Sequence, residues 1–158
     1  MNSFKKEMAE FLEQVDFEKN LGDIHKFPPL KLVNALFPFL YSTDKTLKER
    51  TVTGLGEVVS KMAEADLESA RNIMRRLMLS LTEESGGIGW GAPEAMGEIM
   101  ARSEKLANEY HKILISYTPG GGNHLDFEDL QKDVIAGLKR LSMVRPELVK
   151  EVDHLLNI

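Results

Sequence analysis

Apolar residues recur along the chain at steps of three and four, the spacing that places them on one face of an α-helix. The first stripe, Phe4, Met8, Phe11, Leu12 and Val15, follows the possible caps Asn2 and Ser3. Over the whole chain the pattern predicts about eight helices, starting near positions 3, 28, 46, 66, 93, 103, 126 and 146. No segment alternates apolar and polar residues over the length of a strand, so the sequence predicts an all-α fold.

Local residues mark several of these boundaries. The predicted caps and first-turn residues are Asp66, Pro93, Ser103, Asp126 with Asp129 as a capping box, and Pro146, which should start one last helix. Pro38 should kink the second helix. The fourth helix should end near Glu84, and the glycine-rich stretch 85–91 should be a loop.

Three stretches of the predicted helices repeat one pattern. They cover 47–58, 88–99 and 130–141, with starts 41 and 42 residues apart. Each has apolar residues at its first, ninth and twelfth positions and a small residue at its eighth. The small residues of the three copies are Gly54, Ala95 and Gly137. We expect the small residues to let paired helices pack closely. The period is that of HEAT and armadillo repeats.

The residues inside these copies resemble a HEAT repeat. Phe37-Pro38-Phe39-Leu40, Asp44 and Leu47-Lys48 lead into Gly54-Leu55-Gly56-Glu57-Val58, which is similar to the "A-L-G-E" run of that family. Ala95-Met96-Gly97-Glu98-Ile99 is similar to the phycobilisome-lyase type of HEAT-like repeat. The third copy departs from the pattern, because Lys139 and Arg140 replace Gly-Glu.

This resemblance implies a short right-handed α-α superhelix, a HEAT/armadillo-like solenoid. It divides a single domain, 1–158, into an N-terminal capping helix, three repeats and a C-terminal capping helix. The corresponding ranges are 1–22, then 28–64, 66–102 and 103–143, then 145–158. Stacked helix pairs of this kind share one continuous core.

Composition narrows the function. The 158 residues are 42% apolar and 28% charged, as in a soluble globular domain, and no stretch is long and apolar enough for a membrane span. Lys plus Arg number 20 and Asp plus Glu 25, and the resulting net charge of −5 disfavours a nucleic-acid partner. The chain has no cysteine, which excludes disulfides and thiolate sites. With no signal segment near the first residue, we expect a cytoplasmic location.

The sole tryptophan, Trp90, lies among four glycines in 85–91, beside a predicted helix start. Free N–H groups at such a start can receive an anion or a peptide carboxylate, and a tryptophan there can stack on a ligand or anchor a partner. The alternative interpretation is structural: Trp90 fills a gap, and the glycines allow the chain to bend.

Charged residues of the repeats form the second candidate site. Glu57 and Glu98 occupy the same repeat position, Glu94 lies one helical turn before Glu98, and Arg50 is on the second helix of its repeat. Together they are predicted to line a concave groove for a basic or mixed-charge segment. The alternative is an ordinary solvated helix surface.

No metal site, catalytic set or cofactor is predicted. The histidines, His25, His111, His124 and His154, are isolated, and no repeated His-Glu dipeptide of the kind found in HEAT-like metal hydroxylases occurs. The first functional hypothesis is therefore a non-enzymatic adaptor that binds a protein or peptide through Trp90 and its concave surface. The alternatives are a bilin-lyase-like or DNA-glycosylase-like enzyme, which the repeat family includes, and a structural subunit of a larger assembly.

Overall fold

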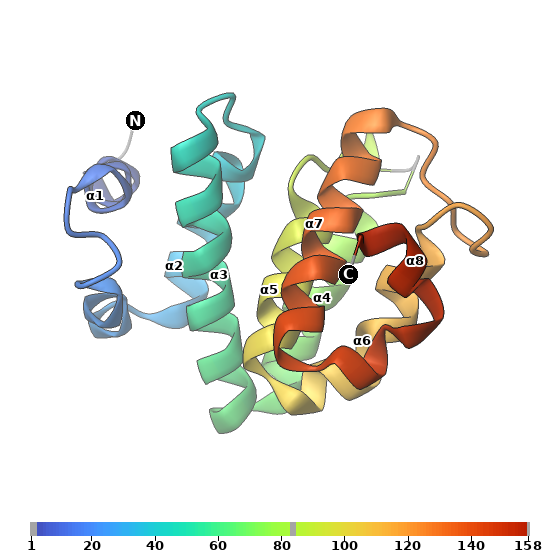
Figure 1. Ribbon diagram of the computed structural model, residues 1–158. Helices are drawn as coiled ribbons and strands as arrows, with labels where there is room; N and C mark the ends of the chain where they lie inside the picture. The colour runs from blue at the N-terminus through green and yellow to red at the C-terminus, as the bar shows by residue number, and fades with distance from the viewer. Residues whose placement is uncertain (1–2, 83–84, 158) are drawn as a thin grey trace.

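Helices form most of the described chain, residues 3–82 and 85–157, in this computed structural model (Figure 1). The α-helices are α1 (Ser3–Glu13), α2 (Pro29–Leu36), α3 (Lys45–Ala65), α4 (Leu67–Leu79), α5 (Ala92–Arg102), α6 (Glu104–Ser116), α7 (Glu128–Val144) and α8 (Asp153–Leu156). The 3₁₀ segments are η1 (Leu21–Lys26), η2 (Phe37–Tyr41), η4 (Pro146–Leu148) and η5 (Lys150–Val152). No strand occurs in those two ranges, which confirms the all-α prediction.

Two predicted helix caps are confirmed. Asp66 accepts a hydrogen bond from the N–H of Ser69 at the start of α4, at 3.4 Å. Ser103 does the same for the N–H of Leu106 in α6, at 3.3 Å. These bonds satisfy N–H groups that have no partner inside the helix, so each fixes where its helix begins.

The predicted capping box at Asp126 and Asp129 is wrong. Phe127 is the N-cap of α7, and it makes no side-chain cap. The segment before α7 is held by a residue of the helix itself. The side-chain amide of Gln131 donates to the carbonyls of Tyr117 and Leu125, at 2.6 and 2.7 Å. This side-chain contact holds the segment before α7, but it does not accept from the first N–H groups of the helix as a cap does.

The predicted kink at Pro38 is a change of helix type. The α-helix α2 ends at Leu36, and the 3₁₀ segment η2 continues through Tyr41. Proline has no N–H to donate, so the regular α-helical ladder stops here.

Both ends of the chain differ from the prediction. Helix α1 ends at Glu13, so Val15 is 90% exposed and Phe17 is buried in its place. The prediction of a single last helix is wrong as well. The segments η4, η5 and the short α8 follow one another, because Val149 and Val152 take non-helical backbone angles.

Helix α4 ends at Leu79. The expected end near Glu84 and the expected cap Asn2 lie outside the described residues.

The helices form two layers (Figure 1). Helices α3, α5 and α7 lie side by side and run in the same direction, so their N-termini share one edge of the molecule. Helix α2 packs on α3, α4 packs on α3 and α5, and α6 packs on α5 and α7. The chain progresses from blue to red across this arrangement, and each helix of the row contacts most extensively the helix two places away along the chain, α3 with α5 and α5 with α7.

The repeated apolar positions form the core of the row of three helices. Residues at the ninth and twelfth positions of all three copies are buried: Leu55, Met96, Leu138, Val58, Ile99 and Leu141. The first position is different. Ile88 is exposed because it lies in the loop before α5, whereas Leu130 is buried.

The backbones of α5 and α7 approach each other closely at two glycines. A Cβ added to Gly97 would collide with the backbone of Gly137, and one added to Gly137 would meet the carbonyl oxygen of Pro93. Small residues do permit close packing here, but between α5 and α7 of the parallel row. Gly54 makes only ordinary contacts with side chains.

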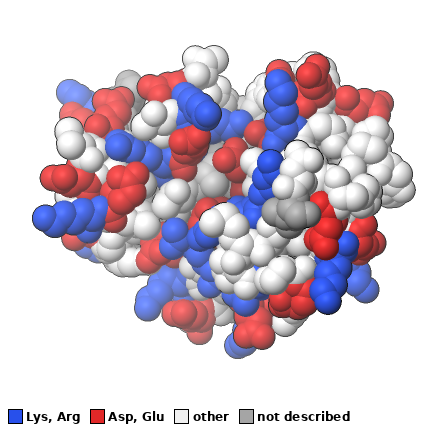
Figure 2. Space-filling model, viewed as in Figure 1, with Lys and Arg blue, Asp and Glu red and all other residues white. Residues whose placement is uncertain are grey.

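Acidic and basic side chains are interspersed over the face shown in Figure 2. The two described ranges contain no helix of the length and apolar character needed to cross a membrane. No buried side-chain nitrogen or oxygen within them lacks a hydrogen-bond partner, so the interior polar groups are satisfied.

Candidate functional site

Trp90 lies in the loop that leads into α5, and glycines on both sides set its position. Gly91 is the N-cap of α5 with a φ of 77°, a left-handed conformation that glycine adopts without strain. Its N–H donates to Oδ2 of Asp133 on α7 at 2.7 Å. The loop is thereby fastened to α7, and the indole is held at the edge where the three parallel helices begin.

Trp90 contacts a second aromatic ring from another part of the chain. Phe127, directly before α7, meets the indole edge-on, with ring centroids 5.6 Å apart and an interplanar angle of 88°. Trp90 is part-buried, while Phe127 is 55% exposed. Edge-to-face pairs of this kind are favourable, so each ring restrains the other. We call the pair the aromatic ridge.

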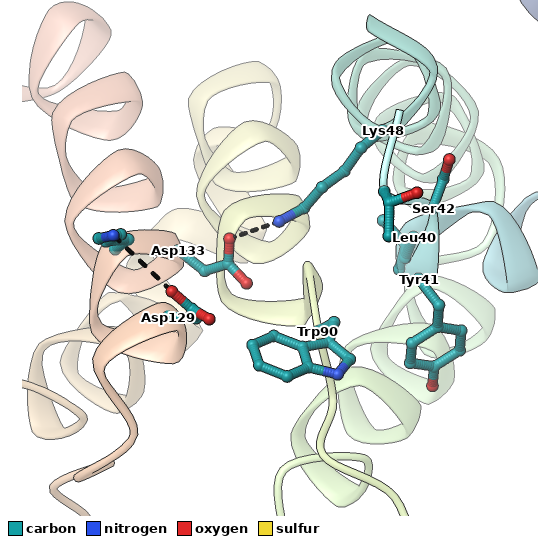
Figure 3. A pocket seen from close by; sticks show the side chains of 9 residues that line it. Leu40, Tyr41, Ser42, Lys48, Trp90, Asp129 and Asp133 are labelled. Carbon is teal, nitrogen blue, oxygen red and sulfur yellow. Dashed lines mark hydrogen bonds and ion pairs between the residues drawn. The ribbon is translucent and has the colours of Figure 1, made fainter. Parts of the chain in front are cut away.

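A cleft of about 450 Å³ opens next to the indole (Figure 3). It is lined by Leu40, Tyr41, Ser42, Thr43, Lys48, Trp90, Asp129, Lys132 and Asp133. The residues come from η2 and the turn after it, from the first turn of α3, from the loop before α5 and from the first turns of α7, so the packing of these segments creates it. We call it the Trp90 cleft. Its size suits a side chain or a short piece of peptide.

Lys48 and Asp133 of the Trp90 cleft belong to an ion-pair cluster that also includes Glu94, which does not itself line the cleft. Nζ of Lys48 lies 2.7 Å from Oδ1 of Asp133 and 3.9 Å from Oε2 of Glu94. Asp133 is only 5% exposed, and its other oxygen accepts from Gly91. Burial raises the pKa of Glu94 above its usual range, against the opposing effect of Lys48. One ammonium group therefore serves two half-buried or buried carboxylates.

A larger and more apolar groove, of about 810 Å³, includes the other ring of the ridge. It runs between the ends of α4 and α6 and the segment before α7. Its apolar lining consists of Met78, Leu79, Leu81, Ile113, Tyr117, Leu125, Phe127 and Leu130. Burial raises the pKa of Tyr117 to about 12, so the phenol stays neutral at physiological pH. We call this the Phe127 groove; the aromatic ridge lies between it and the Trp90 cleft.

The predicted carboxylates Glu57 and Glu98 are brought together elsewhere, in an ion-pair network. Glu98, 7% exposed, accepts from Nε of Arg102 at 2.6 Å and from Nε and Nη2 of Arg140 at 2.9 and 3.2 Å. Glu57 accepts from Nη1 of Arg102 at 2.6 Å, and its other oxygen lies 2.8 Å from Nε2 of His25. We call this the Glu98 network. It ties α3, α5 and α7 together and leaves no open acidic face at these two carboxylates.

Arg50 lies apart from the other predicted residues. Its Nη1 donates to the carbonyls of Leu12 and Gln14, both at 2.8 Å, and its guanidinium lies over the ring of Phe17. It fastens the chain that leaves α1 to α3. Of the predicted site residues, Trp90 and Glu94 therefore belong to the N-terminal edge, Glu57 and Glu98 to the Glu98 network, and Arg50 to neither.

Sequence reasoning missed Tyr41, Phe127 and Asp133. The three are distant from Trp90 in sequence, so no local spacing connects them with it. One signal existed: Asp133 lies three residues after Leu130 and four before Gly137, on the face of the helix that is buried, where a carboxylate needs a partner.

Within residues 3–82 and 85–157, no three His, Cys, Asp or Glu side chains are grouped so that they could hold a metal ion. No known family model, curated protein or solved structure matches this chain. The function is therefore argued from the geometry of the clefts and of the charges around them.

Proposed function

We propose that the chain is a protein-binding module of the HEAT-like type, a short right-handed superhelix that holds a peptide segment of a partner. Two observations support the repeat architecture. Helices α3, α5 and α7 form a parallel row, with α2, α4 and α6 packed on it. The apolar residues at the ninth and twelfth positions of all three copies also enter one core. A cytoplasmic location is part of the proposal, and fractionation of cells that produce a tagged chain would test it.

The aromatic ridge is the observation that carries the binding role. Trp90 and Phe127 are large rings beside two clefts, and Tyr41, which is 50% exposed, adds a third ring. Tryptophan and tyrosine are the residues that most often dominate interface energies, above all next to a concave surface. Burying this ridge under a partner would remove its apolar surface from water.

Selection of random peptides displayed on phage against the immobilised protein tests the proposal. We expect peptides whose binding weakens at least about tenfold in Trp90→Ala, since an interface anchor of this size contributes more than 1.4 kcal/mol. Tyr41→Ala provides a second variant, because its half-exposed ring can be removed with little effect on the core. Far-UV circular dichroism verifies that each variant is folded.

Leu30→Ala is the matched control, because Leu30 is 56% exposed and lines neither cleft. It should bind the selected peptides as the wild type does. If folded Trp90→Ala and Tyr41→Ala variants bind every selected peptide as tightly as the wild type, the ridge is not a binding surface and the proposal fails.

A further inference from the structure

The carboxylates that line the Trp90 cleft differ in how tightly they are paired. The lining carries two carboxylates, Asp129 and Asp133, and two ammonium groups, Lys48 and Lys132. Asp133 is buried and holds Lys48 at 2.7 Å, whereas Asp129 lies 3.7 Å from Lys132 and both of those side chains are exposed. Exposed pairs at this distance are weak, so Asp129 is the lining carboxylate that a ligand can reach.

Aromatic faces line the same cleft. In Figure 3 the rings of Trp90 and Tyr41 lie along one side, and Asp129 and Asp133 extend from α7 on the other. Elsewhere in the molecule, cations already cover ring faces: Lys31 lies 4.3 Å from the ring centroid of Phe4. Over the described residues, no lysine or arginine covers the face of Trp90, whose ring partner is the edge-on Phe127.

We propose that the Trp90 cleft binds a cationic side chain, arginine or lysine, of the partner segment. The cation would lie against the indole and phenol faces, opposite the carboxylates of α7. Asp129, whose side chain is 60% exposed, would accept its hydrogen bonds. The neighbouring Phe127 groove would receive apolar side chains of the same segment. This inference rests on the proposed function and names the chemistry of its ligand.

Peptides whose binding depends on Trp90 provide the probe. In each peptide, the arginines are replaced one at a time by citrulline and the lysines one at a time by norleucine, which remove the charge and keep most of the shape. Replacing the residue that occupies the cleft should weaken binding to the wild-type protein about tenfold, the loss expected for a cation held between rings and a carboxylate.

A variant of the protein tests the same contact from the other side. Asp129→Asn should weaken binding of the unmodified peptides about three- to tenfold and have little effect on the neutral ones. Asp23→Asn makes the same change of charge at an exposed aspartate of η1 that lines neither cleft, and it should leave binding unchanged.

The outcomes separate the two proposals. If the Trp90-dependent peptides carry no cation, or bind equally well with citrulline and norleucine, the cation site is refuted while the binding module stands. Trp90-dependent peptides with an essential acidic residue would lead to the same conclusion. If no peptide depends on Trp90, both proposals fall.

Discussion

Two polar clusters connect α3, α5 and α7, and they differ in what is left over for a ligand. In the Glu98 network, Glu98 receives two arginines, and one of these, Arg102, also binds Glu57, so the charges are used up inside the chain. At the Trp90 cleft, Lys48 is shared between two carboxylates, and aromatic rings stay accessible. The comparison shows that a conspicuous charge is evidence for a site only when its neighbours leave it unsatisfied.

Reversing the charge of Glu98 should have the largest effect on stability. In Glu98→Lys, three cations would meet at a position that is 7% exposed, with Arg102 and Arg140 losing their carboxylate. Breaking a buried pair on one side costs about 3 to 5 kcal/mol. Urea unfolding should show the loss as a lower midpoint with an unchanged slope.

Glu64→Lys is the control for Glu98→Lys. Glu64 pairs with Lys61 at 3.5 Å, but both side chains are exposed. Its free energy of unfolding should change by less than about 1 kcal/mol. Equal losses in the two variants would mean that the Glu98 network does not hold the helices together.

Asp133→Ala should have the second largest effect on stability, because it removes contacts that join the loop before α5 and Lys48 to α7. The N–H of Gly91 would lose its acceptor, and Lys48 would lose its closer carboxylate. A buried donor without a partner costs about 1 to 3 kcal/mol. The fluorescence of Trp90, the sole tryptophan, should also shift, since its neighbour Gly91 is released. Asp129→Ala, at an exposed position on the same helix, should change stability by less than about 0.5 kcal/mol.

The pH dependence of Glu94 should be the smallest effect. The pKa of Glu94 is raised in the folded protein, so the native state keeps the proton after the unfolded chain has lost it. This contribution to stability is complete below the ordinary value of 4.5 and is lost as the pH rises through the folded pKa. Glu94→Gln lacks the titration. Its free energy of unfolding should therefore gain on that of the wild type as the pH rises from about 4 towards neutrality, and a constant difference would contradict the assignment.

Local signals in the sequence predicted the helices, whereas long-range contacts determined the start of α7 and the breaks in the C-terminal segment. Asp66 and Ser103 were readable as caps because a cap bonds to a residue three positions later. The start of α7 was not, because Gln131 fixes it through carbonyls that precede the helix by several residues. The short helices after Val144 also depend on tertiary packing of Val149 and Val152, which are buried.

The candidate site was predictable only in part for the same reason. Trp90 stood out by its rarity and its glycines, but its partners Tyr41 and Phe127 come from η2 and from the segment directly before α7. Arg140 was visible as a departure from the Gly-Glu pattern of the repeat. Its role depends on α5 and α7 lying side by side, because Arg140 then pairs with Glu98 together with Arg102.

Amide hydrogen exchange with and without a bound, Trp90-dependent peptide tests the contrast between the two clusters most directly. Our account predicts added protection at 41–44, 87–92 and 127–133, around the Trp90 cleft and the aromatic ridge. It predicts no change at 57–60 and 98–102, in the Glu98 network. Protection concentrated at the Glu98 network, with none around Trp90, would show that the paired charges form the partner surface and would contradict the account.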